Sequence, residues 1–306
     1  MGQIHRISVP KLGQSRAQAL GFQKNLWGLL LEGSQQALRL RVEGRSKAKG
    51  PAPQWLKEAT QVEFKGYGNR PGELLFSAPP LGTVMEQDDR RPLFPRAYSP
   101  NQTALELLEE SIADAMALRR DSEWMDEAFL DTLEGHLKPI FRDTPSLHWA
   151  NGRSLDLNPE SVGQLEALRR ETPPKQWCRI VGKLEVIRHS DHAFALMLED
   201  GRAIRGVADP DLDHTMKKWW GEKVVVEGQA VFRPSQNLLR VEAHKIDLAE
   251  KGDAIWSAIP APLFPDLSLQ ALHEAQGPKA GLAAIIGKWP GNESDETLLE
   301  SLDALR

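Results

Sequence analysis

The sequence predicts an α+β protein built around a five-stranded β-barrel, with a helical hairpin, a β-rich N-terminal domain and an extended C-terminal tail. Residues 177–247 contain five runs in which apolar and polar residues alternate, and one helical run precedes the fourth. Residues 99–145 repeat their apolar residues at helical spacing instead. The end of the chain combines prolines, apolar residues and an acidic segment. The expected parts are 1–98 (β-rich domain), 99–145 (helical hairpin), 146–176 (linker), 177–247 (barrel) and 248–306 (tail).

The composition is that of a soluble globular protein. The 306 residues are 41% hydrophobic and 26% charged, and no apolar run is long enough to cross a bilayer. The N-terminus lacks the pattern of a secretory signal, and the single cysteine, Cys178, excludes an internal disulfide. The expected compartment is therefore the cytoplasm. A net charge of −5 argues against a general duplex-DNA binder, which needs a basic surplus to neutralise phosphates.

In the first 98 residues, three segments rich in β-formers predict strands at 37–44, 60–68 and 72–80. Each ends at glycine or proline, which are frequent in turns. The leucine spacing of residues 14–33 predicts one helix, although two glycines weaken that pattern.

Two helices are expected in 99–145. Ser99 is a candidate N-cap, with Pro100 at the first helical position and Gln102 as the partner of a capping box. Ser122 is the candidate cap of the second helix, which should end before Pro139. The acidic faces of these helices are expected to be solvated, because no Glu-x-x-His pair accompanies them as in a carboxylate metal site.

In 177–247, strands are expected around Ile180–Val186, 194–198, 202–208, 223–232 and 238–246, with a short helix within 209–221. Asp200-Gly201 predicts a type I′ hairpin turn. This order of elements resembles the OB-fold, a five-stranded Greek-key barrel with a helix between its third and fourth strands. A generic five-stranded sheet with a covering helix is the alternative.

The OB resemblance implies ligand binding across the second and third strands and at two loops, here 189–192 ("HSDH") and 233–237 ("RPSQN"). Phe194 and Phe232 fall on the apolar phase of their strands, so we expect them in the core rather than as stacking platforms. A single-stranded nucleic acid would be bound by arginines that cluster on one face. The candidates are Arg188, Arg202, Arg205, Arg233 and Arg240.

No catalytic residue, metal site or cofactor is assigned. His189 and His192 lie at a predicted turn without a third ligand nearby in the sequence, whereas catalytic zinc needs three protein ligands. Cys178 has no neighbouring base and is expected to be a buried, inert thiol. Phosphate-binding glycine loops and nucleophile-elbow or zincin motifs do not occur.

The tail contains Ile286-Gly287-Lys288-Trp289-Pro290-Gly291, followed by acidic residues and a leucine-rich helical segment. This stretch resembles the C-terminal ends of bacterial antitoxins. The resemblance implies a peptide that docks on a toxin or effector, often a small ribonuclease. The candidate partner-binding residues are Lys288, Trp289, Pro290, Gly291, Leu298 and Leu302. The alternative is a C-terminal helix that packs on the protein's own body.

The leading hypothesis is a non-catalytic, antitoxin-like bacterial adaptor, whose tail binds an effector or nuclease of a toxin–antitoxin or phage-defence system. The first alternative is an OB-fold protein that binds single-stranded nucleic acid. The second alternative is a metal-dependent hydrolase that uses His189 and His192.

Overall fold

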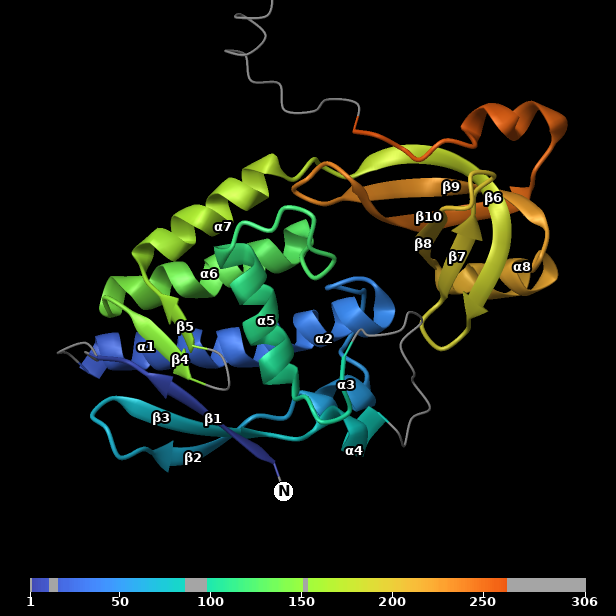
Figure 1. Cartoon of the computed structure of the whole chain (residues 1–306). Coiled ribbons are helices and arrows are strands. Elements are labelled where there is room, and N and C mark those ends of the chain that lie inside the picture. The colour runs from blue at the N-terminus through green and yellow to red at the C-terminus, as the bar shows by residue number, and fades with distance from the viewer. Residues whose placement is uncertain (1, 11–15, 86–97, 151–153, 263–306) are drawn as a thin grey trace, which may run out of the picture. The chain divides into compact units, whose positions relative to one another are not determined.

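The computed structural model describes residues 2–10, 16–85, 98–150 and 154–262 and shows an α+β protein (Figure 1). A helical body with its own sheet precedes a β-barrel in the chain. We refer to residues 2–175 as the body and to residues 176–248 as the barrel. The predicted fold class is confirmed.

The sheet of the body has five strands in the order β2-β3-β1-β4-β5, and all neighbours are antiparallel. Because side chains alternate along a strand, Ile7, Phe76 and Trp149 point to one face and are fully or almost fully buried. Figure 1 shows α1, α5 and α6 on one side of this sheet. The strands are β1 (Gln3–Ser8), β2 (Glu63–Tyr67), β3 (Glu73–Ala78), β4 (Leu147–Ala150) and β5 (Ser154–Leu157).

One hydrophobic core joins this sheet to the helices and contains residues from Ile7 to Leu168. The predicted domain 1–98, the helical hairpin 99–145 and part of 146–176 therefore share a core. The helical segments are α1 (Arg16–Gly28), η1 (Leu29–Gly33), α2 (Ser34–Glu43), α3 (Gln54–Ala59), α4 (Leu81–Met85), α5 (Ala104–Met116), α6 (Glu127–Asp143) and α7 (Pro159–Glu171).

The prediction of a strand at 37–44 is wrong, because residues 37–43 lie in helix α2 and Gly44 is its C-cap. Leucine and arginine alternate here, which mimics a strand, but nine of the ten residues of α2 are buried. Arg39 pairs with Glu43 one helical turn away, and Arg41 is bonded to Ser111 of α5. A helix that is surrounded by protein has no solvated face, so it shows no helical periodicity.

The segment 146–176, predicted as a linker, forms β4, β5 and α7. The two strands have four residues each, which is too short for alternation to be evident. Two helices, α5 and α6, lie within 99–145 as predicted, and α5 packs mainly on α2 while α6 packs on α1 and α7. Both caps lie later than expected. Thr103 caps α5 in a capping box with Glu106, and Asp126 caps α6, which contains Pro139.

The barrel is closed, with strand order β10-β8-β7-β6-β9. Strands β8 and β10 are parallel, while the other neighbours are antiparallel. This mixed topology, with a helix after the third strand, is compatible with an OB-like fold. Its elements are β6 (Gln176–Arg188), β7 (Ala193–Met197), β8 (Ala203–Ala208), η2 (Pro210–Leu212), α8 (Asp213–Lys218), β9 (Lys223–Phe232) and β10 (Leu238–Leu248).

Phe194 fills the middle of the barrel and is 0% exposed, and Phe232 is also buried, as predicted. A Cβ on Gly206 would lie 2.1 Å from Cζ of Phe194, so only glycine lets the ring lie across β8. The hairpin between β7 and β8 differs from the expected type I′ turn. Gly201 has a φ of 79°, but Asp200 does not have the positive φ that this turn also requires.

Beyond β10, the short helix η3 (Lys251–Trp256) packs against β6. Arg179 of β6 lies 3.8 Å from Asp253 of η3, and Ile259 packs against the barrel core. The described chain ends at residue 262.

Candidate functional site

The five arginines predicted to bind nucleic acid do not form one open surface. Arg188, Arg205, Arg233 and Arg240 all contact or pair with groups of the body. Arg202 lies apart in the β7–β8 hairpin and pairs with Asp200. The structure therefore brings four of the five together, at the junction of barrel and body.

The loop between β9 and β10 is held by the segment that follows α5. Arg233 donates hydrogen bonds to Asp121 at 3.0 Å and to Glu123 at 3.3 Å. Asp121 also accepts hydrogen bonds from Ser235 and Asn237. Through these bonds, the loop "RPSQN", a predicted ligand-binding loop, binds the chain's own acidic segment.

Two further arginines continue this contact. Arg205 of β8 donates a hydrogen bond of 2.6 Å to Glu123. Arg240 of β10 lies 3.1 Å from Asp126, and the side chains of this pair are 5% and 2% exposed. Three carboxylates of one segment, at 121, 123 and 126, thus neutralise three arginines of the barrel.

Asp126 is the most constrained of these groups, because it also caps α6 and accepts two hydrogen bonds from Ser46. Burial raises the pKa of Asp126, but attraction to Arg240 and the bonds from Ser46 and Phe129 lower it further than burial raises it. The pKa of Asp126 therefore lies below its ordinary value, so this carboxylate is ionised at neutral pH.

The outer face of β7 and β8 has small apolar side chains. Ala193, Ala195 and Val207 are buried although none belongs to the barrel core. Gly44 at the end of α2 lies against Val207, and Arg188 donates to the carbonyl oxygen of Val42. In OB-folds this face binds the ligand, whereas here the body covers it.

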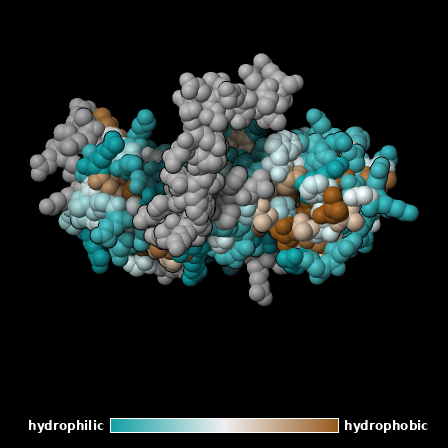
Figure 2. Space-filling view, turned by 90° about the horizontal axis from the view of Figure 1, so that it is seen from above, coloured by the Kyte–Doolittle hydropathy of each residue, from teal (hydrophilic) through white to brown (hydrophobic). Residues whose placement is uncertain are grey.

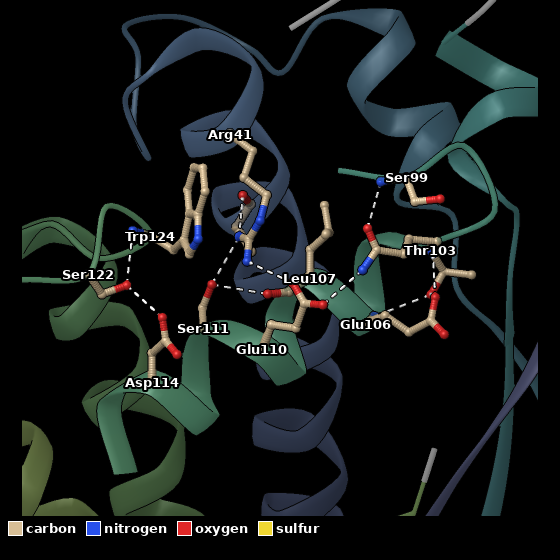
Figure 3. Close-up of polar contacts among 12 residues, drawn as sticks. Arg41, Ser99, Thr103, Glu106, Leu107, Glu110, Ser111, Asp114, Ser122 and Trp124 are labelled. Carbon is tan, nitrogen blue, oxygen red and sulfur yellow. Dashed lines mark hydrogen bonds and ion pairs between the residues drawn. The ribbon is translucent and has the colours of Figure 1, made fainter. Parts of the chain in front are cut away.

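The acidic segment is positioned by polar contacts around α5 (Figure 3). The guanidinium of Arg41 lies 4.7 Å from the centre of the Trp124 ring and donates to Ser111 at 3.0 Å. Ser122 donates to Asp114 of α5 at 2.7 Å and accepts from the backbone of Trp124. Burial lowers the pKa of Arg41 to about 10, so the group stays charged at neutral pH. These contacts fix the backbone on both sides of Glu123.

A second candidate surface lies where the described chain approaches its end. Trp177, Ile255 and Trp256 are exposed, and we call them the η3 patch. Ile255 and Trp256 lie on η3, which packs against β6, the strand that carries Trp177. Figure 2 shows hydrophobic surface gathered on the barrel. The exposure of Trp177 could have been predicted from the sequence. It lies at the same alternating positions of β6 as Arg179 and Lys183, which face outward.

The two histidines of "HSDH" share one carboxylate. His189 and His192 lie 2.8 and 2.7 Å from the two oxygens of Asp213, the first residue of α8. Within the described ranges, no group of three His, Cys, Asp or Glu residues is placed to hold a metal ion. Burial raises the pKa of the Cys178 thiol to about 11, which agrees with an unreactive cysteine.

The predicted partner-binding residues of the tail lie outside the described residues. They are Lys288, Trp289, Pro290, Gly291, Leu298 and Leu302.

Among the helices that the structure describes, none is long and apolar enough to span a membrane. Comparisons with protein families, curated proteins and solved structures find no match to this chain.

Proposed function

We propose that this protein is a non-catalytic adaptor that binds a partner protein through the η3 patch and the tail that follows it. The observation that carries the proposal is the exposure of Trp177, Ile255 and Trp256 close to the point where the tail begins. Ile255 is 76% exposed, although it belongs to the residue types that are most often buried. Aromatic and aliphatic side chains of this kind are the usual centre of a protein interface.

The barrel–body junction supports this proposal indirectly. The outer residues of β7 and β8 are already buried, Val207 lies against Gly44 of the body, and nearby arginines are paired with carboxylates. A partner therefore meets the barrel elsewhere, and η3 offers exposed apolar side chains next to the start of the tail. The class of partner follows from the resemblance of the tail to antitoxin tails: an effector or nuclease of a bacterial toxin–antitoxin or phage-defence system.

The test is recovery of partners from the native cells with three tagged proteins: the full chain, a chain ending at residue 262, and the full chain with Ile255→Asp and Trp256→Asp. The matched control is Phe64→Asp with Tyr67→Asp, which alters two exposed aromatic residues on β2 of the body. We expect the full chain and the control to recover the same partner, and the other two to lose it. Equal recovery by all four proteins contradicts the proposal.

Single-strand nucleic-acid binding is the second candidate, because the barrel topology is compatible with an OB-like fold. It requires Arg205 and Arg233 to release Glu123 and Asp121. It predicts fluorescence-polarisation binding of labelled single strands at low salt, with steep weakening as salt rises. Binding should also tighten in Asp121→Asn/Glu123→Gln; absence of binding by this variant at low salt excludes the candidate.

A further inference from the structure

A polar cavity of about 240 Å³ lies on the body, on a side of α2 that the proposed function does not use. Its walls come from the π-helical turn η1, from α2 and from the loop after α2, and they include Glu32, Gln35, Gln36, Arg39 and Lys47. A liquid water molecule occupies about 30 Å³, so the cavity has room for roughly eight non-hydrogen atoms. Single π-helical turns within α-helices are frequent at functional sites.

Gln36 is 8% exposed, and its side chain has one unused acceptor. Its Nε2 donates to Thr132 at 2.9 Å, and the Thr132 hydroxyl donates to the carbonyl oxygen of Ala128. Because the threonine hydroxyl already donates its proton, its oxygen can only accept a hydrogen bond from Gln36. The amide nitrogen of Gln36 must therefore face Thr132, and the amide oxygen must point away from it. Oε1 is left without a hydrogen-bond partner in the described part of the chain. A buried acceptor without a donor is unfavourable, and a ligand that donates to it relieves this cost.

Arg39 has an unused donor on the same wall. It is 9% exposed, and its Nε lies 3.4 Å from Glu43 but makes no hydrogen bond within the described residues. Lys47 is exposed at the mouth of the cavity, and no described residue forms an ion pair with it. The cavity therefore has a cationic side with donors to spare.

The opposite charge comes from Glu32, whose carboxylate is held 3.2 Å from Nε2 of His136. The loop that carries Lys47 is also fixed, because Ser46 is bonded twice to Asp126. Glu32 and the loop that carries Lys47 are thus held by α6, which contains His136, and by its N-cap Asp126, before any ligand binds.

We infer that this cavity binds a small zwitterion of the free amino-acid class. Its carboxylate accepts from Lys47 and Arg39, and its ammonium donates to Glu32 and to Oε1 of Gln36. Both unused atoms are buried, so ligand binding requires the side chains of Gln36 and Arg39 to rotate toward the cavity. This inference does not depend on the proposed function, because the cavity contains no residue of the η3 patch.

The test is calorimetric titration of the full chain with pools of the standard amino acids at millimolar concentration, followed by titration with each member of a positive pool. We expect at least one amino acid to bind, and acetate and methylamine, which each carry only one of the two charges, to bind more weakly. Absence of heat with every pool overturns the inference.

Two variants locate the site. Lys47→Met and Gln36→Leu should each weaken binding at least tenfold, whereas Lys49→Met, an exposed lysine outside the cavity, should bind as the wild type does. Lys47 is exposed, so its substitution leaves the fold intact even if that of Gln36 does not. Unchanged affinity in Lys47→Met also overturns the inference.

Discussion

At the scale of single residues, His5 is a buried imidazole in β1, 3.1 Å from the hydroxyl of Thr103. Burial lowers its pKa from 6.5 to about 4. The unfolded chain therefore takes up a proton below pH 6.5 that the folded chain does not take up until about pH 4. The stability that this group contributes is present at neutral pH and is lost as the pH falls through this window.

We predict that the free energy of unfolding falls by up to about 2 kcal/mol between pH 7 and pH 5 from this residue alone. In His5→Gln, this contribution to the pH dependence of the unfolding free energy should be absent. Urea unfolding of both proteins at the two pH values measures it. An equally steep fall in His5→Gln would show that other groups cause it.

Asp126 and Arg240 form a buried pair across the barrel–body junction. Arg240→Met leaves the carboxylate buried and uncompensated, and we expect a loss of about 3–5 kcal/mol in unfolding free energy. Arg202→Met is the control, because the Arg202–Asp200 pair is exposed to solvent and should contribute little to stability. Denaturant titration compares the two variants. An equal loss of unfolding free energy in both variants would contradict the claim that the buried pair stabilises the protein more than an exposed pair does.

At the scale of elements, β8 depends on Gly206. A Cβ there overlaps the Phe194 ring, so Gly206→Ala must displace the largest side chain of the barrel core. We predict a destabilisation of about 1–3 kcal/mol, measured by thermal or urea unfolding. Gly252→Ala in η3 is the control, since nothing lies within 4 Å of its Cβ position. A Gly206→Ala protein as stable as the control would contradict this account of the barrel core.

The barrel strands could be predicted from sequence because each places apolar side chains, such as Phe194, on its inner face, so that apolar and polar residues alternate clearly. The body could not be predicted as well. Nearly all residues of α2 are buried and the helix contains an internal ion pair, Arg39–Glu43, and β4 and β5 are short strands. Strand β1 joins them to β3 from the start of the chain, and such distant pairing has no local signal.

The candidate site, too, could be predicted only in part from the sequence. The arginines could be named from their positions in an OB-like order of strands, but their partners could not. Arg205 and Arg233 bind Glu123, which lies 82 and 110 residues away in the chain. The hydrogen-bonded acidic residues look like solvated surface residues in the sequence. Only the folded arrangement brings them to the barrel.

At the scale of the whole molecule, residues 1–263 form one compact unit by their contacts. Buried and partly buried ion pairs join the barrel to the body, so we predict that a chain ending at residue 262 unfolds in a single calorimetric transition. The triple variant Arg205→Met/Arg233→Met/Arg240→Met should unfold in two separate transitions, one for the barrel and one for the body. Two transitions in the unsubstituted chain would show that the junction does not couple barrel and body.

The central claim is that a partner binds at the η3 patch while the body occupies the outer face of β7 and β8. Site-specific photo-crosslinking tests it most directly, with p-benzoyl-phenylalanine in place of Ile255 or, in a second protein, in place of Arg202 at the exposed β7–β8 hairpin. Our account predicts that irradiation of native cells joins the partner to position 255 and not to position 202. A crosslink at position 202 without one at position 255 would contradict it.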